Sequence, residues 1–389
     1  MRCPCDPYRK DEEPPPVKPP KKRPPKPGRA EPMRLLKEVS RSFYLTMRVL
    51  PRSLRQQISA AYLLARATDT IADTELIPVE VRLEVLQRLR TAILAGQSSS
   101  FVEGDSEVWA LLQAQEETSE KTLLENIGEV IRRVEKFSAE DRADIHTVLE
   151  TITEGQLMDL KRFVVGRLPG EIRALQSEEE LDQYTYSVAG CVGEFWTRLC
   201  RRHLYPRAVI DEEKLFENAI HFGKGLQLVN ILRDLPADLK NGRCYLPEKS
   251  LQKLELSAES LKDPENYPFL RAYYKWYLAK ALFYLQDGAR YLEDTPGCWR
   301  TWLMKLGCTW PILIGAKTLK LLGETNPLDA TRRVKVSRKE VKAILFSTIL
   351  RGFIPGAWKD LFEETFKEAH RSVVCHSRTV LPREEPSKD

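Results

Sequence analysis

Apolar residues recur every three to four positions along almost the whole chain after residue 32. This period predicts amphipathic helices, whereas the strict alternation that is typical of half-buried strands is scarce. The apolar stripes cover 58–71, 81–94, 123–134, 145–163, 181–204, 215–232, 270–291, 299–322 and 341–353. Glycine and proline mark the breaks between stripes, and no linker-like stretch interrupts the series. The pattern therefore predicts a single all-α domain over residues 33–370.

The first 32 residues have a different composition. They hold 11 of the 25 prolines, and nine Lys/Arg against five Asp/Glu. Such a segment buries too little apolar surface to offset its ordering entropy, which predicts a disordered or polyproline-II leader over 1–32. Its role stays open between a solvated leader without function and a ligand for an SH3-like domain or an anionic membrane. Residues 371–389 are predicted to form a polar C-terminal tail.

Most of the net charge of +5 belongs to this leader. Residues 33–389 carry 52 Lys/Arg against 51 Asp/Glu, so the body of the chain is almost neutral and no nucleic-acid partner is expected. The leader lacks the apolar core of a signal peptide, and no uncharged apolar run approaches the ~18 residues of a membrane span. We therefore expect a cytoplasmic protein that could still rest on the inner face of a membrane.

The cysteines and histidines argue against a zinc site. The eight cysteines are scattered without a CxxC pair, and the five histidines show no metal-ligand spacing. Cysteines of this kind, in a chain without a signal peptide, are typical of reduced and mostly buried thiols. No glycine-rich phosphate loop follows a strand-like run.

Two stretches carry acidic residues in helices that are otherwise apolar. In the first, Asp69 and Asp73 are four residues apart, so both carboxylates project from one side of the helix about one turn apart. In the second, polar residues at i, i+3, i+7 and i+11 share one face: Gln227, Asn230, Asp234 and Asp238.

Spacing alone does not make these acid pairs a site. With 56 acidic residues in 389 positions, chance supplies about eight pairs at i, i+4, and most such pairs are solvated. A carboxylate on an apolar helix, however, needs a compensating charge. Two acid pairs on facing helices would form an anionic cleft for Mg²⁺ and a diphosphate, since Mg²⁺ is usually held by one or two carboxylates plus substrate phosphates. Structural ion pairs with nearby arginines are the alternative.

Five ordered motifs make the chain resemble the squalene/phytoene synthase family over roughly residues 33–350. They are Ser40-Arg-Ser-Phe43-Tyr, Tyr62…Arg66…Asp69-Thr-Ile-Ala-Asp73, Gly155-Gln-Leu-Met-Asp-Leu160, Tyr184-Thr-Tyr-Ser-Val-Ala-Gly190-Cys-Val-Gly193, and Asn230-Ile-Leu-Arg-Asp234…Asp238 leading to Gly242-Arg-Cys-Tyr-Leu-Pro247. The resemblance implies the all-α isoprenoid-synthase fold, a single-domain helical bundle around a central cavity. It also implies a Mg²⁺-dependent prenyltransferase that acts on farnesyl diphosphate.

The resemblance further implies roles for individual residues. The Mg²⁺ ligands would be Asp69, Asp73, Asp234, Asp238 and Asn230. The diphosphate would be cradled by guanidinium forks and hydroxyl or amide groups, from Ser40, Arg41, Ser42, Tyr62, Arg66, Gln227, Asn230, Arg233 and Tyr245. Among these, Arg66 and Arg233 would stabilise the leaving group. Tyr184 is similar to the family's tyrosine near the ionising diphosphate, and Phe43 to an aromatic ring that can face a carbocation.

An enzyme of this family joins two prenyl diphosphates through a cyclopropyl intermediate such as presqualene diphosphate. Two features favour squalene as the product of this chain. The first acid motif reads Asp-Thr-x-x-Asp, as in squalene synthases, and residues 307–341 resemble their NADPH-associated segment. Lys335, Arg338 and Lys339 would there meet the phosphates of NADPH; a solvated basic turn is the alternative.

Other outcomes stay open. Without NADPH, a synthase of the same fold would give presqualene diphosphate, dehydrosqualene, hydroxysqualene or phytoene, and a non-catalytic helical assembly factor is a more remote alternative. Pro236 lies between Asp234 and Asp238, and a proline inside a helix removes one of its hydrogen bonds. We therefore expect a kink or a helix end there, which weakens the case for Asp238 as a ligand. Peripheral membrane contact is expected because the substrate and product are apolar. No oligomeric state is predicted.

Overall fold

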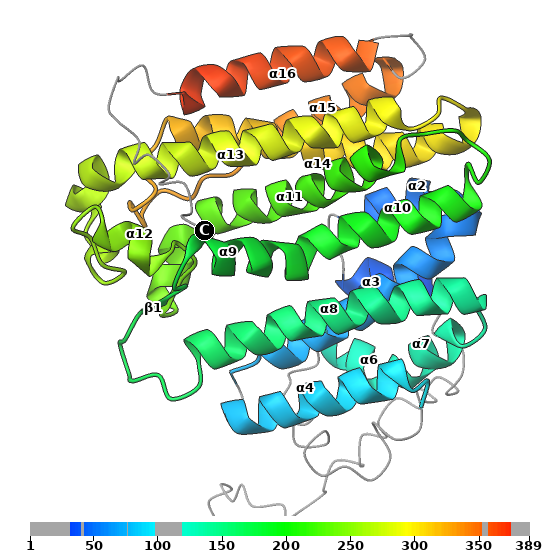
Figure 1. Ribbon diagram of the computed structural model, residues 1–389, viewed down its shortest axis with the longest axis horizontal. Helices are drawn as coiled ribbons and strands as arrows, with labels where there is room; N and C mark the ends of the chain where they lie inside the picture. Colours follow the sequence, from blue (N-terminus) through cyan, green and yellow to red (C-terminus); the bar gives the residue numbers. More distant parts are fainter. Residues whose placement is uncertain (1–31, 40–42, 76, 98–118, 352–356, 375–389) are drawn as a thin grey trace, which may run out of the picture.

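The computed structural model describes residues 32–39, 43–75, 77–97, 119–351 and 357–374. The fold is all-α, as predicted, and long helices lie side by side from α4 at one edge to α16 at the other (Figure 1). The helices are α1 (Pro32–Val39), α2 (Phe43–Val49), α3 (Arg52–Asp73), α4 (Val79–Leu94), α6 (Ser119–Glu125), α7 (Ile127–Val134), α8 (Ala139–Phe163), α9 (Glu178–Thr185), α10 (Cys191–His203), α11 (Glu212–Lys240), α12 (Glu248–Gln252), α13 (Tyr267–Asp294), α14 (Trp299–Gly323), α15 (Arg338–Arg351) and α16 (Ala357–Val373).

Shorter elements connect these helices. A π-helical turn, η1 (Tyr186–Gly190), joins α9 to α10, and two 3₁₀ turns, η2 (Ser260–Lys262) and η3 (Pro264–Asn266), precede α13. Strands β1 (Arg173–Ala174) and β2 (Arg243–Cys244) form a parallel pair in which Arg173 lies opposite Arg243. This pair holds the segment after α11 against the segment after α8.

The apolar stripes of the sequence form the core. Helix α11 packs along α13 in the middle of the molecule, α10 and α14 flank this pair, and α3 packs against α8. One continuous hydrophobic cluster extends from α1 to α16. The polar residues between the stripes begin the helices: the Ser138 hydroxyl accepts from the Asp141 N–H at α8, and the Asp211 carboxylate accepts from the Lys214 N–H at α11.

A buried carboxylate connects three helices at one end of the bundle. Asp141 on α8 accepts hydrogen bonds from Gln57 on α3 at 3.1 Å, from Arg202 on α10 at 2.7 Å, and lies 2.8 Å from His203 on α10. Burial raises the pKa of Asp141, but the hydrogen bonds from His203, Gln57 and Arg202 outweigh it and hold this pKa below its ordinary value. The carboxylate is therefore a structural group that joins α3, α8 and α10.

The stripe over 181–204 is less regular than predicted. A helical apolar stripe was expected there, and a π-helical turn divides the α-helical part of it, which is common next to functional sites. The small residues of this stretch serve close helix packing: a Cβ on Gly193 would lie 2.0 Å from the Ala219 carbonyl oxygen, and one on Gly223 would lie 2.2 Å from that of Ala189. Val192 is exposed at the surface.

The far end of the chain also differs slightly from expectation. Helix α16 continues to Val373, three residues into the predicted polar tail, because the Val373 side chain is buried. The predicted leader lies outside the described residues up to residue 31, and the tail lies outside them from residue 375. Within the described segments, no helix is both long and apolar enough to cross a bilayer.

Candidate active site

The first acid pair lies in the last turns of α3. Asp69 and Asp73 stand one turn apart, and Arg66 precedes them by one turn. The Arg66 guanidinium binds the Asp69 carboxylate at 2.5 Å and reaches Glu120 on α6 at 2.7 Å. Partial burial and the negative charge of Asp73 raise the pKa of Asp69 to about 6, and burial also raises the pKa of Asp73. The charges of Arg243, Arg66 and Arg82 lower the pKa of Asp73 but do not offset its burial, so the pair remains crowded with negative charge. Tyr62 lies one further turn back on the same helix.

The second acid pair lies near the end of α11. Asp234 is bound by the neighbouring guanidinium of Arg233, whose Nε lies 2.9 Å from Oδ1. Burial and the negative charge of Asp234 raise the pKa of Asp238 to about 7. The polar face predicted for this helix continues upstream, where the Asn230 amide donates to the Gln227 side-chain oxygen at 3.5 Å. The opposite face, with Leu228, Val229, Ile231, Leu232 and Leu235, is buried.

The helix does not end at Pro236. Of the expected kink or helix end, the helix end is wrong, because α11 continues to Lys240 and includes Asp238. Pro236 has no N–H to donate to the carbonyl of Leu232, four residues earlier. The hydroxyl of Tyr274, fully buried on α13, donates to that carbonyl at 2.9 Å. A tertiary donor thus replaces the missing helical hydrogen bond, and Asp238 stays on the same polar face as Asp234.

A third acidic residue, Asp159 on α8, lies between the two pairs. Its carboxylate accepts a hydrogen bond from the Tyr245 hydroxyl at 2.7 Å and forms an ion pair with Arg243 at 3.0 Å. Burial raises the pKa of Asp159, against the positive charge of Arg243 and the Tyr245 hydrogen bond, while the charge of Asp73 raises it further. We call these three residues, Asp159, Arg243 and Tyr245, the junction.

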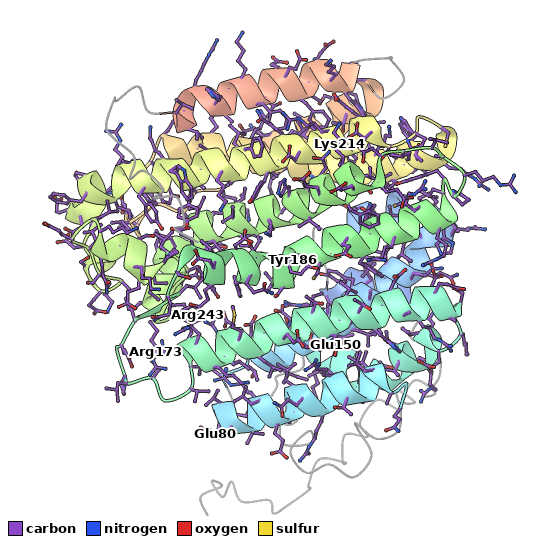
Figure 2. The ribbon with its side chains drawn as sticks, viewed as in Figure 1. Glu80, Glu150, Arg173, Tyr186, Lys214 and Arg243 are labelled. Carbon is purple, nitrogen blue, oxygen red and sulfur yellow. The ribbon has the colours of Figure 1, made fainter. Side chains whose placement is uncertain are left out.

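The junction is electrostatically connected to both acid pairs. The positive charge of Arg243 lowers the pKa of Asp73 on one side and of Asp238 on the other, in both cases against burial, which raises them. The negative charge of Asp159 raises the pKa of both Asp69 and Asp238. Figure 2 shows Arg243 at the end of the bundle where β1 and β2 pair, close to Arg173. Both acid pairs therefore belong to one site.

Two aromatic rings line the junction. Tyr184, on α9, stacks on the ring of Tyr245 with centroids 4.9 Å apart and an interplanar angle of 24°. Phe163 meets the same ring edge-on at 5.1 Å. Burial, reinforced by the negative charge of Asp159, raises the pKa of the Tyr184 phenol far above its ordinary value. The hydroxyl of Tyr184 is therefore protonated at neutral pH.

Asp159 and Arg243 were not predicted as site residues. Both fall within quoted motifs, 155–160 and 242–247, so the signal was available. Asp159 is an acid in an apolar helical stretch, the same property that distinguished the two acid pairs. Its partner Arg243 lies 84 residues further along the chain, and only the fold connects them.

Other predicted site residues lie elsewhere or outside the described residues. Ser40, Arg41 and Ser42 are not among the described residues, and of Phe43 only the backbone, at the start of α2, is described. Lys335, Arg338 and Lys339 are exposed, before and within the first turn of α15. The contacts that assemble the two acid pairs and the junction do not include these three cations.

The site's donors fit a hard divalent cation. In the part of the chain that the structure describes, no three His, Cys, Asp or Glu side chains come together closely enough to hold an ion by themselves. Mg²⁺, however, rarely uses a complete protein cage and is usually bound by one or two carboxylates together with substrate phosphates. Crowded carboxylates with raised pKa values, on both sides of the junction, match that donor set.

A separate hollow of about 1020 Å³ lies beside α8. Its lining includes Arg90 on α4, Lys161 on α8 and Glu248 on α12. The four acids of the two pairs do not line it. The central cavity implied by the resemblance stays a prediction.

Comparison with known proteins identifies relatives of this fold and site. The family model for squalene/phytoene synthase matches residues 36–340. The chain is 31% identical over 230 residues to the presqualene diphosphate synthase of Zymomonas mobilis, which covers 58% of this chain and 63% of that protein. It is 30% identical over 225 residues to the bifunctional lycopene cyclase/phytoene synthase of Blakeslea trispora, covering 57% and 33%. A ligand complex of TcSQS has a similar fold, with a TM-score of 0.64 and 22% identity over 88% of this chain and 98% of that one. The chain spans between a third and a half of the length of the first curated relatives that it matches.

Proposed function

The chain belongs to the squalene/phytoene synthase family, and on that premise we propose that it joins two molecules of farnesyl diphosphate head to head. Presqualene diphosphate would be the intermediate, and reduction by NADPH would give squalene. The observation that carries the proposal is the convergence of both acid pairs on the junction. Carboxylates interleaved with Arg66, Arg233 and Arg243 can receive a diphosphate together with cations.

The side chains would divide the task between binding and proton control. Arg66 and Arg233 each orient one acid of a pair, and Arg243 places a further positive charge between the pairs. These guanidiniums would hold the diphosphate oxygens. Mg²⁺ bound at the acid pairs would supply Lewis-acid stabilisation of the departing diphosphate. The protonated Tyr184 hydroxyl would donate a hydrogen bond beside the departing group, shielded from water by burial of the ring.

Reduction to squalene is the part of the proposal that depends on NADPH. Its support is the basic stretch with Lys335, Arg338 and Lys339, whose exposed cations suit the phosphates of that cofactor. The same proposal includes farnesyl diphosphate as the substrate, because the family's members act on prenyl diphosphates of this kind.

A second candidate stops at presqualene diphosphate. One observation favours it: the Zymomonas mobilis relative, at 31% identity, is a presqualene diphosphate synthase. Dehydrosqualene, hydroxysqualene and phytoene are further products of the same chemistry without NADPH. All of them begin with a head-to-head condensation of two prenyl diphosphates. A synthase of presqualene diphosphate releases its product before a second ionisation, whereas the other products differ in how the second cation is quenched, and phytoene requires C20 instead of C15 units.

Product analysis separates these candidates. Purified protein is incubated with C15 or C20 prenyl diphosphate and Mg²⁺, with and without NADPH, and the products are identified by mass spectrometry. Squalene formed only with NADPH supports the first candidate, whereas presqualene diphosphate in both conditions supports the second. No coupled product from either substrate would favour a non-catalytic assembly factor.

Two variants test the site itself. Asp69→Asn is expected to lower the coupling rate by about 100-fold or more, because it removes a carboxylate proposed to hold Mg²⁺, whose charge would stabilise the departing diphosphate. Glu150→Gln is the matched control, since Glu150 is exposed on α8 in an ion pair with Arg90. Full coupling activity in Asp69→Asn would contradict the assignment of the acid pairs.

A further inference from the structure

Helix α15 exposes an apolar stripe to solvent. Phe346, Ile349 and Leu350 are 67%, 40% and 54% exposed, and their spacing of i, i+3 and i+4 puts them on one side of the helix. Ala343, one turn earlier on the same side, is also exposed. Single exposed apolar side chains are ordinary, but three large ones within five residues of one helix face form a patch.

The orientation of α15 is determined by its buried face. Ile344 and Thr348 point into the protein, where the Trp310 indole of α14 donates to the Thr348 hydroxyl at 2.9 Å. The Trp358 indole of α16 donates to the Thr348 carbonyl at 2.9 Å. In Figure 1, α15 lies beside α14 and α16 at one edge of the bundle. With these contacts in place, Phe346, Ile349 and Leu350 must face outward.

The same stretch carries a strong positive charge. Residues 332–351 contain seven Lys/Arg and one acidic residue, Glu340. Glu340 takes part in the helix start, where its carboxylate accepts from the Ser337 N–H at 3.0 Å and the Ser337 hydroxyl accepts from the Glu340 N–H at 3.2 Å. Lys335, Arg338, Lys339 and Lys342 are exposed around this first turn. The charge contrasts with the nearly neutral body of the chain.

We propose that this surface binds an anionic lipid bilayer. The α15 surface, defined as Lys335, Arg338, Lys339, Lys342, Phe346, Ile349 and Leu350, has the composition of an interfacial helix: cations toward the headgroups and an apolar stripe that inserts below them. The proposal goes beyond the reaction, and it competes with NADPH for three of the cations, Lys335, Arg338 and Lys339.

Other occupants explain less of the surface. NADPH phosphates would account for Lys335, Arg338 and Lys339 but not for the apolar stripe that follows them. A second copy of the chain would cover the stripe, but a two-fold contact would bring two surfaces of the same positive charge together. An anionic bilayer complements both parts at once.

Vesicle flotation tests the proposal with the purified full chain and no substrate, so its outcome is independent of catalysis. We expect binding to vesicles of phosphatidylcholine with phosphatidylglycerol, weak binding to phosphatidylcholine alone, and loss of binding at high salt, which screens exposed charges. The triple variant Phe346→Ser, Ile349→Ser, Leu350→Ser should bind at least about tenfold more weakly. Lys342→Gln should weaken binding about fivefold.

Matched controls use exposed apolar residues from other parts of the fold. Val209→Ser and Phe269→Ser replace side chains that are also exposed, before α11 and on α13, and should leave vesicle binding unchanged. Thermal unfolding confirms that each variant is folded. Equal binding of the triple variant and the unmodified chain would overturn the proposal. Sedimentation that shows a dimer abolished by the triple variant would overturn it in favour of self-association. A Lys339→Gln variant that loses NADPH affinity and keeps vesicle binding would assign that cation to the cofactor instead and remove it from the α15 surface.

Discussion

Tyr274 and Pro236 form a pair whose interaction can be measured. The Tyr274 hydroxyl is the tertiary donor to the Leu232 carbonyl, which lost its helical donor to Pro236. Both Tyr274 and Leu232 are buried. Tyr274→Phe removes the hydroxyl and keeps the ring, so it leaves a buried acceptor without its donor. Such an acceptor costs about 1–3 kcal/mol, and we expect the free energy of unfolding to fall by about 2 kcal/mol.

The cost should depend on the proline. In Pro236→Ala the backbone N–H returns and can donate to Leu232 within the helix. In that background Tyr274→Phe should cost less than about 1 kcal/mol, because the carbonyl keeps one donor. The difference between the two costs is the coupling energy of the pair, expected at about 1 kcal/mol or more.

The measurement is urea unfolding followed by circular dichroism, with the midpoint and the slope fitted for all four proteins of the cycle. Tyr277→Phe is the matched control: Tyr277 is also buried on α13, but its hydroxyl donates to Glu178 on α9. Its cost should be the same in the unmodified chain and in the Pro236→Ala variant. If Tyr274→Phe also costs the same in both backgrounds, the hydroxyl does not compensate for the proline, and the reasoning about the continuity of α11 fails.

Three further changes test other contacts. Arg243→Gln should destabilise the protein by about 3 kcal/mol by leaving Asp159 buried without its ion-pair partner, and adding Asp159→Asn should restore part of that loss in the same unfolding assay. Gly223→Ala should lower the melting temperature, because its Cβ would lie 2.2 Å from the Ala189 carbonyl oxygen in η1 and overpacking costs about 1–3 kcal/mol. The control Gly297→Ala, which has open space around the new Cβ, should leave the melting temperature unchanged. The Asp141→Asn variant should be less stable than the parent near neutral pH. The difference in stability should vanish as the pH falls through the lowered pKa of Asp141, because the stabilisation is present only while the carboxylate is ionised. The same difference in melting temperature at every pH would contradict this.

Local spacing was sufficient to predict the helices and the two polar faces. Asp69 and Asp73 lie on one side of α3 because four residues make about one helical turn, and this holds whatever the rest of the fold does. For the same reason Gln227, Asn230 and Asp234 share one face of α11. Apolar periodicity likewise predicted the buried faces, because burial on one side of a helix selects that period.

Contacts between distant segments were beyond such reasoning. Pro236 was expected to disturb α11 because a proline always removes a helical hydrogen bond. The hydroxyl that replaces it belongs to Tyr274, 42 residues away from Leu232, and nothing in the local pattern indicates it. The junction has the same character: Asp159 and Arg243 meet because β2 pairs with β1 after α8.

The charge balance of the site explains why its residues were detectable at all. Asp69, Asp73, Asp159, Asp234 and Asp238 face the guanidiniums of Arg66, Arg233 and Arg243. Among the described residues the negative charge is not fully offset, because Glu120 also shares Arg66, although the charge of Arg82 also acts on Asp73. Burial and mutual repulsion raise the pKa of Asp69 to about 6 and of Asp238 to about 7. A fold selected for stability alone would not retain such a surplus, since unpaired buried charge is costly. A diphosphate would add more negative charge, so the site can receive one only together with cations. The surplus that marked these helices in the sequence is therefore the property that the proposed reaction needs.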